Sequence, residues 1–179
     1  TAACTLWRDL RHADDPDVRR YLAESLAVAR EIGDTARVTA VLSDMAMASL
    51  GQGDAKAARG CLEEAIELAR QRGDKRALAA ALNGLAQLHR GAGELDAAEP
   101  LYWNVLTLAR EVGDREVVGI ALSNLAMVSI GRNAADRVSA MLLEVIAIAA
   151  DIGSKPAGQS ALEVCAGLAA ASSDWARAA

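Results

Sequence analysis

The sequence reads Ala109-Arg110-Glu111-Val112-Gly113-Asp114 at residues 109–114, and this phrase recurs along the chain at a step of 40 residues. The related phrases are Ala29-Arg30-Glu31-Ile32-Gly33-Asp34, Ala69-Arg70-Gln71-Arg72-Gly73-Asp74 and Ala149-Ala150-Asp151-Ile152-Gly153-Ser154. Other columns keep the same step: Leu42, Leu82, Leu122 and Leu162; Ala46, Ala86, Ala126 and Ala166; and Leu26, Ile66, Leu106 and Ile146. So many columns in one register indicate an internal repeat.

Each repeat contains two helical patterns. The first runs from about Asp74 to Arg90 and the second from about Glu94 to Val112, and both place apolar residues at a period of 3.6. In the second helix Pro100 removes a backbone hydrogen bond, so that helix must bend there or begin later than its counterparts.

Glycines separate the helical patterns. Glycine can adopt the left-handed conformation that ends a helix, and an Asp or Ser after it can cap the next one. We therefore predict nine or ten antiparallel helices, with turns near Gly33, Gly53, Gly73, Gly93, Gly113, Asn133, Gly153 and Ser173.

The repeat length alone fits several architectures, including HEAT units and β-propeller blades. Propeller blades are excluded because the alternating pattern and turn density of strands are missing. The residue pattern within one unit argues against HEAT units. It reads Leu85-Ala86-x-x-His89, then Gly93, Ala98, Tyr102 and Val105. This unit resembles the tetratricopeptide consensus. The resemblance implies an all-α, right-handed superhelical solenoid of antiparallel helix pairs.

The resemblance covers essentially the whole chain as a single array of about four and a half repeats. Its units are 1–33 (partial), 34–73, 74–113, 114–153 and 154–179 (partial). The first residue is Thr1, and Asp174 to Ala179 begin a helical pattern without finishing it, so we expect a fragment of a longer protein.

A narrower resemblance lies in the stretch from Leu62 to Asp74 and in the residues from Leu162 onward. These segments look like the C-terminal tetratricopeptide arms of large bacterial signal-transduction ATPases, including LuxR-type and related transcriptional activators and some ATPase-linked nucleotide cyclases. That resemblance implies a sensing and autoinhibitory surface, with DNA binding, ATP binding or cyclase chemistry in other domains.

The composition limits which classes of partner and which cellular compartment we expect for the chain. A net charge of −5 and a pI of about 5.1 provide no basic field for a phosphate backbone, so we expect no direct nucleic-acid partner. No apolar run is long enough to span a bilayer. Cys4, Cys61 and Cys165 are far apart and set among apolar residues, which favours buried thiols in a reducing, cytoplasmic compartment.

No motif indicates catalysis, a cofactor or a metal. Gly51-Gln52-Gly53-Asp54 and Gly91-Ala92-Gly93-Glu94 lack the Gly-Lys-Ser/Thr of a phosphate loop and follow no predicted strand, so we interpret them as inter-helix turns. Arg72-Gly73-Asp74 matches a known adhesion tripeptide. It lies at the turn that every unit repeats, so we interpret it as part of that turn. His12 and His89 assemble no catalytic or metal constellation, and His89 takes the place of a packing Tyr. For Trp7, Trp103 and Trp175 we favour core or rim packing over a binding platform.

The resemblance to tetratricopeptide repeats implies that the first helix of each pair lines a concave groove. Its predicted peptide-binding residues are Ser43, Met47 and Leu50, then Asn83, Gln87 and Arg90, then Ser123, Asn124, Met127 and Ile130, and Glu163 continues the row. Amides can hydrogen-bond a peptide backbone and Met side chains can adapt to apolar anchors. In chaperone-adaptor tetratricopeptide domains, Lys and Asn residues on these faces hold the terminal carboxylate of a peptide. Here Ser43, Met47, Ser123 and Met127 occupy those places, so we expect no carboxylate clamp. An alternative is that Met47, Leu50, Met127 and Ile130 only pack between units.

The leading hypothesis is therefore a non-enzymatic scaffold that binds a protein or peptide, or another domain of its parent, as the regulatory arm of a bacterial signalling or transcription-regulating protein. The alternative is a structural module that self-associates through its terminal repeats, because a truncated array lacks polar caps. An enzyme is the third reading, and no constellation of residues supports it. The residues do not identify the ligand.

Overall fold

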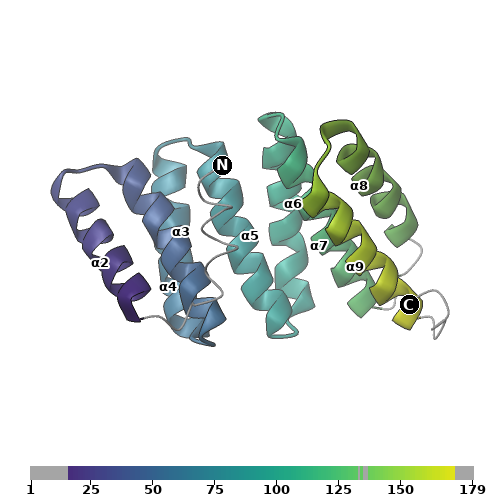
Figure 1. Cartoon of the computed structure of the whole chain (residues 1–179), viewed down its shortest axis with the longest axis horizontal. Helices are drawn as coiled ribbons and strands as arrows, with labels where there is room; N and C mark the ends of the chain where they lie inside the picture. The colour runs from purple at the N-terminus through teal and green to yellow at the C-terminus, as the bar shows by residue number, and fades with distance from the viewer. Residues whose placement is uncertain (1–15, 133, 135–136, 172–179) are drawn as a thin grey trace. The chain divides into compact units, whose positions relative to one another are not determined.

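The computed structural model describes residues 16–132, 134 and 137–171, and this part of the chain is entirely helical apart from its turns (Figure 1). Its eight helices are α2 (Pro16–Glu31), α3 (Thr35–Gly51), α4 (Ala55–Gln71), α5 (Lys75–Gly91), α6 (Leu95–Glu111), α7 (Arg115–Gly131), α8 (Val138–Ile152) and α9 (Lys155–Ala171). The all-α prediction of consecutive helix pairs is confirmed. The remaining predicted helices, with Trp7, His12, Trp175 and Cys4, fall on residues 1–15 and 172–179, outside the described residues.

The turns lie where the repeated glycines predict them. Glycines at six of the eight predicted turns have positive φ between 64° and 78°: Gly33, Gly53, Gly73, Gly93, Gly113 and Gly153. The Asp that follows the glycine caps the next helix in four turns, since Asp34, Asp54, Asp74 and Asp114 each accept a hydrogen bond from a backbone N–H three residues on. The turns expected near Asn133 and Ser173 lie outside the described residues.

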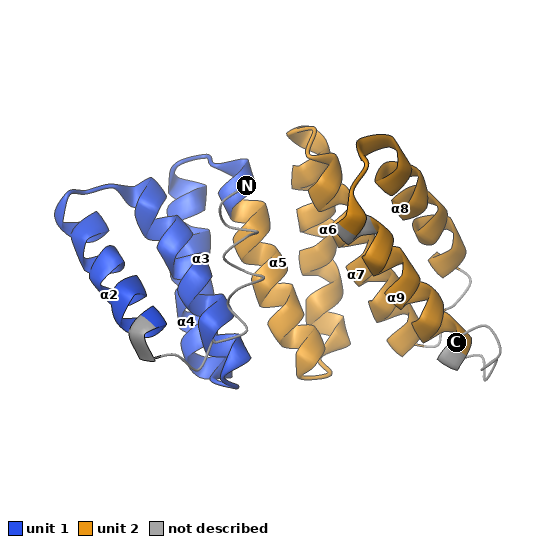
Figure 2. Ribbon diagram, viewed as in Figure 1, with its two compact units in different colours: residues 1–77 blue, residues 78–179 orange. Residues whose placement is uncertain are grey.

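The chain divides into two compact units, residues 1–77 and 78–179 (Figure 2). In the first unit α3 packs against both α2 and α4. The buried positions of this unit are mostly Ala, Val, Leu and Ile, and Ala29, Ala46, Ala58 and Ala65 are fully buried. Small side chains at these positions let the helix axes approach closely. Arg30 on α2 also forms a 2.6 Å ion pair with Glu64 on α4.

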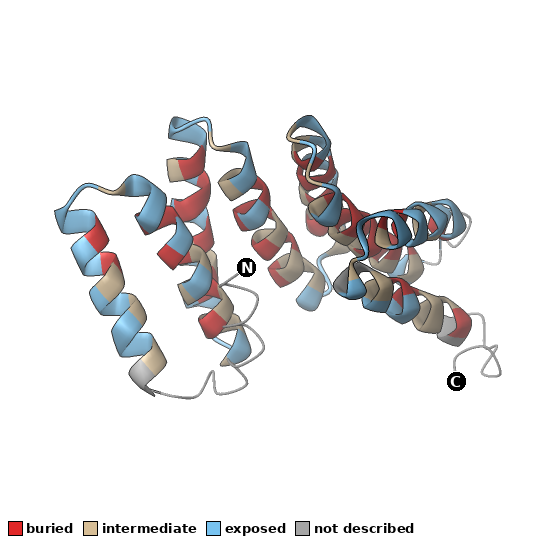
Figure 3. Cartoon of the chain, turned by 45° about the horizontal axis from the view of Figure 1, so that its top comes forward, coloured by how far each residue is buried: buried red, intermediate tan, exposed pale blue. Residues whose placement is uncertain are grey.

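In the second unit α7 packs against α6, α8 and α9. The largest fully buried side chain of the described residues is Tyr102, and Val105, Leu106 and Leu125 are buried with it. Buried positions alternate with exposed ones along these helices (Figure 3). Arg110 pairs with Glu144 at 2.8 Å, with the same spacing of 34 residues as the pair in the first unit. The repeat therefore carries a surface ion pair as well as a core.

Pro100 lies inside α6, which begins at Leu95. Its counterpart α4 begins at Ala55, 40 residues earlier, so the two helices share one register. The alternative of a later helix start is therefore wrong. Pro100 sits in the second turn, and because it has no N–H, the Asp96 carbonyl loses its usual helical donor.

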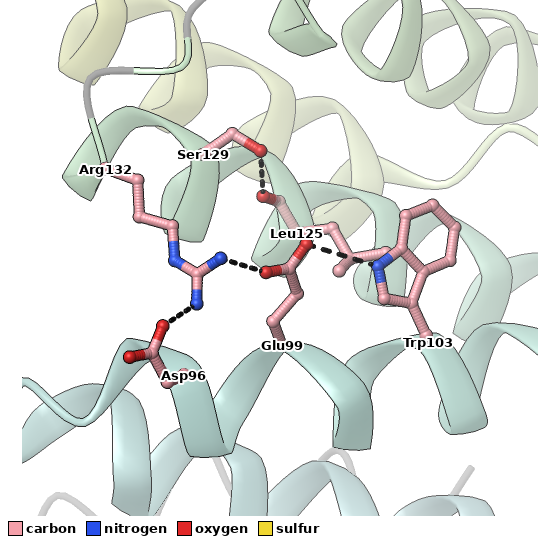
Figure 4. A network of polar contacts seen from close by, with 6 residues as sticks. All are labelled: Asp96, Glu99, Trp103, Leu125, Ser129 and Arg132. Atoms are coloured by element: carbon pink, nitrogen blue, oxygen red, sulfur yellow. Dashed lines mark hydrogen bonds and ion pairs between the residues drawn. The ribbon is translucent and has the colours of Figure 1, made fainter.

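A polar network joins the beginning of α6 to the end of α7 (Figure 4). Arg132, the residue that caps the C-terminus of α7, forms ion pairs with Asp96 and Glu99. Glu99 also accepts a 3.4 Å hydrogen bond from the indole Nε1 of Trp103. Trp103 is 40% exposed, so of the two predicted environments, core or rim, it does not occupy the core.

The structure bears on two side-chain expectations, one for the cysteines and one for His89. Cys61 and Cys165 are free thiols, and they are only partly buried where buried thiols were predicted. His89 is partly buried, and its Nδ1 lies 2.5 Å from Oε2 of Glu94 across the turn between α5 and α6. It contributes to the turn, in agreement with a structural histidine.

Candidate functional site

The first helices of three successive pairs meet around a cavity in the second unit. The cavity has a volume of about 280 Å³ and is lined by residues of α5, α7 and α9. Its lining residues are Gln87, Arg90, Ile120, Ser123, Asn124, Met127, Ser160, Glu163 and Val164. The structure thus brings together Gln87, Arg90, Ser123, Asn124, Met127 and Glu163 from the sequence prediction.

Asn83 lies next to this lining rather than in it. Its Oδ1 accepts a 3.1 Å hydrogen bond from Nδ2 of Asn124, which links α5 to α7. Both residues are half-buried. One donor group of Asn83 and one acceptor of Asn124 stay available to a ligand, because each amide offers both.

Arg90 is held in place by a residue of the following helix. Its Nε donates a 3.3 Å hydrogen bond to the hydroxyl of Tyr102, whose side chain is fully buried. Burial raises the pKa of Tyr102 above its ordinary value, and the hydrogen bond and positive charge of Arg90 oppose that rise. The phenol therefore stays protonated at neutral pH and acts as a fixed acceptor for the guanidinium.

The apolar members Met127 and Ile130 both pack against the buried cluster of α7, α8 and α9, but only Met127 lines the cavity. Met127 lines the cavity, and a Cβ built on Gly167 of α9 would lie 3.6 Å from its Sδ. Ile130 packs against the buried cluster of Ala126, Val138 and Val164 and is not a lining residue. Ser123 is 6% exposed, and its hydroxyl donates a 2.9 Å hydrogen bond to the carbonyl of Gly119. Ile130 therefore serves packing, whereas Ser123 lines the cavity with its hydroxyl hydrogen already used within α7.

Ser43, Met47 and Leu50 belong to the first unit, on α3, and all three are half-buried. The Ser43 hydroxyl donates to the carbonyl of Thr39 at 3.1 Å, so its hydrogen is used within its own helix.

Sequence reasoning missed three lining residues, Ile120, Ser160 and Val164. Ile120 and Ser160 occupy one column of the repeat at the 40-residue step, and Val164 occupies the column of Asn124. Extending the column of Asn124 to α9 would have found Val164, whereas the column of Ile120 and Ser160 was not among the predicted groove columns.

A second cavity of about 300 Å³ lies between the end of α6, the start of α7 and α8. Its charged side chains are already paired, because Arg110 binds Glu144 and Arg115 binds Asp151. In the first cavity neither Arg90 nor Glu163 has an oppositely charged partner among the described residues. The cavity of α5, α7 and α9 is therefore the stronger candidate for binding.

Over residues 16–132, 134 and 137–171, no three His, Cys, Asp or Glu side chains are grouped as a metal site would require. In the same ranges no helix has the length and apolar character needed to cross a membrane.

Comparison with known proteins agrees with the observed fold. Residues 37–111 match the family model described as tetratricopeptide repeat, and residues 14–47 match that of anaphase-promoting complex subunit 5. The crystal structure of BtubC (BKLC) from P. vanneervenii is similar with a TM-score of 0.71 and 24% sequence identity, over 89% of this chain and 67% of that one. No curated protein sequence matches the chain.

The tetratricopeptide match is to residues 37–111, and the solved structure is similar in fold over 89% of this chain. Tetratricopeptide repeats generally mediate interactions between proteins. The fold defines the class of protein: an all-α helical-repeat scaffold, with a cavity on its first helices.

Proposed function

We propose that the chain binds a protein or peptide segment over the cavity formed by α5, α7 and α9. The observation that carries this proposal is the convergence of polar side chains from three successive first helices on one hollow. Among the described residues Gln87 and Ser160 have no internal hydrogen-bond partner, so both can contact a peptide backbone. Ile120, Met127 and Val164 add apolar contact area.

The setting of this activity is also a proposal. The narrower resemblance supports a regulatory arm of a larger bacterial signalling or transcription-regulating protein in the cytoplasm. The segment that binds then belongs either to a separate protein or to another domain of the parent. Since Arg90 and Glu163 are the only charges on the cavity, raising the salt concentration should change affinity only modestly.

The test is a selection of peptides from a random display library on the folded chain, followed by affinity measurements on variants. Gln87→Ala and Met127→Ala should each weaken a selected peptide about fivefold or more. Asn104→Ala is the matched control, because Asn104 is an exposed amide on the second helix α6. The proposal is overturned if no peptide is selected, or if the selected peptides depend on Asn104 and ignore Gln87 and Met127.

One observation favours self-association as a second candidate function. Leu162 on α9 is 70% exposed, while Leu42, Leu82 and Leu122 in the same column are 2%, 4% and 3% exposed. Ile146 on α8 is 47% exposed, while Leu26, Ile66 and Leu106 are 8%, 5% and 2% exposed. A second copy of the chain could cover this apolar face. Light scattering should then report a dimer that Leu162→Ser converts to a monomer, and a wild-type monomer at high concentration contradicts this candidate.

A further inference from the structure

We propose that the cavity of α5, α7 and α9 selects a dipolar peptide segment, with a carboxylate side chain on Arg90 and a cationic side chain on Glu163. This inference rests on the proposed function and specifies the chemistry of the partner. It is carried by the position of one cation and one anion on the same cavity, with no ion pair between them.

Arg90 is prepared to receive a carboxylate. Its Nε is occupied by the Tyr102 hydroxyl, which leaves the two terminal Nη groups as donors. A guanidinium that is already oriented loses less side-chain entropy on binding than a free one. Two parallel N–H groups match the two oxygens of a carboxylate, which makes this the favoured ligand group.

Glu163 provides the complementary site. It lies on α9, lines the same cavity as Arg90, and its side chain has no partner within the described residues. A ligand that carries only a carboxylate would be attracted by Arg90 and repelled by Glu163, and a ligand that carries only a cation would meet the reverse. A segment with both charges satisfies the two residues together.

The rest of the lining suits the peptide between those two charges. Gln87, Asn124 and Ser160 offer donors and acceptors to backbone groups, and Met127 adapts to an apolar side chain. A volume of about 280 Å³ holds a short segment rather than a folded surface. Charge therefore selects the segment, and the amides hold its backbone.

The probes are heptapeptides with blocked termini that carry one Asp and one Lys two residues apart, in both orders. Matched peptides replace Asp by Asn, or Lys by Gln. Affinities are measured by nuclear magnetic resonance titration of the full chain, with the side-chain amide signals of Gln87 and Asn124 as reporters. We expect one order of the dipolar peptide to bind about three- to tenfold more tightly than either matched peptide.

Variants of the protein test which residue recognises which charge of the peptide. In Arg90→Gln the preference for Asp over Asn in the peptide should disappear while the preference for Lys remains, and Glu163→Gln should show the opposite pattern. Arg110→Gln is the control, since it removes the same charge from the Glu144 pair outside this cavity. It should leave both preferences unchanged.

Tyr102 acts here as a positioning residue. Tyr102→Phe keeps the buried ring and removes the acceptor for Arg90, so it should reduce the preference for Asp and spare the preference for Lys. A merely structural role would lower both preferences together. Equal affinity for all the peptides overturns the dipolar specificity and leaves the proposed function standing. If no peptide perturbs Gln87 or Asn124, both proposals fail.

Discussion

The side-chain amide of Asn124 on α7 donates a 3.1 Å hydrogen bond to Oδ1 of Asn83 on α5. The two residues are 41 positions apart, one more than the repeat, so they belong to different columns. The equivalent pairs one repeat away are Ser43 with Gly84 and Ser123 with Val164, which cannot form this bond, so it is specific to this pair of repeats. Both amides are half-buried, Asn124 in the lining of the candidate cavity and Asn83 next to it, and the hydrogen bond fixes their orientation relative to each other.

Removing either amide should destabilise the fold modestly. Asn83→Ala or Asn124→Ala leaves the other amide with an unmet hydrogen bond, and we expect a loss of about 0.5–1.5 kcal/mol in the free energy of unfolding. The double variant should lose less than the sum of the two, because the second substitution has no bond left to break. Urea unfolding measures these values, with Asn104→Ala as a near-neutral control. If the losses of the two single variants simply add in the double variant, the hydrogen bond between Asn83 and Asn124 does not contribute to stability.

The turn between α5 and α6 offers two glycines with opposite expected responses. Gly93 has a φ of +78°, which L-residues adopt at a cost, so Gly93→Ala should destabilise by about 1–2 kcal/mol. Gly91 is helical, and a Cβ there would meet no atom within 4 Å, so Gly91→Ala should stabilise by about 0.5 kcal/mol. Thermal melting compares the two variants. Shifts of the same sign would refute this account of the turn.

The two acidic partners of Arg132 should differ in importance. The Glu99 side chain is 25% exposed and also accepts from Trp103, whereas the Asp96 side chain is fully exposed. Glu99→Gln should therefore lower stability by up to about 1 kcal/mol, less in high salt, and should alter the fluorescence of Trp103. Asp96→Asn should change neither the stability nor the fluorescence of Trp103. The measurement uses a Trp7→Phe/Trp175→Phe background, and equal effects of the two variants would oppose the prediction.

The Cys61 thiol should react slowly with alkylating reagents near neutral pH. Burial raises the pKa of Cys61, Glu64 raises it further, and Arg30 lowers it. Because the thiolate is the reactive form, iodoacetamide should modify Cys61 more slowly than a small free thiol at pH 8. Glu64→Gln should lower the pKa of Cys61 and Arg30→Gln should raise it. Rates against pH in a Cys4→Ser/Cys165→Ser background report these pKa values.

The raised thiol pKa also affects stability. The folded state keeps the Cys61 proton at a pH where the unfolded chain has released it, so this contribution is complete below the ordinary thiol pKa and is lost as pH rises through the folded value. Replacing Cys61 by Ser should therefore make the free energy of unfolding less sensitive to pH in the alkaline range. An unchanged sensitivity would indicate that Cys61 does not contribute.

The sequence by itself determined the helices, their order and their turns. Gly113 and Asp114 show why: the left-handed conformation of the glycine and the cap from the Asp are local properties that need no distant partner. The apolar columns at the 40-residue step predicted the buried positions of the earlier repeats, since each helix buries the stripe that its own period creates, although Ile146 and Leu162 in the same columns are 47% and 70% exposed.

Tertiary structure alone decided which polar groups of the predicted groove remain for a ligand. Ile130 and Arg90 share one column of the repeat, yet Ile130 packs into the core while Arg90 lines the cavity and bonds Tyr102 of the next helix. Asn83 contacts Asn124 across two helices, out of register with the repeat. A repeat places side chains on a face, whereas the direction and partner of each side chain depend on the packing of neighbouring helices, which a single column cannot encode.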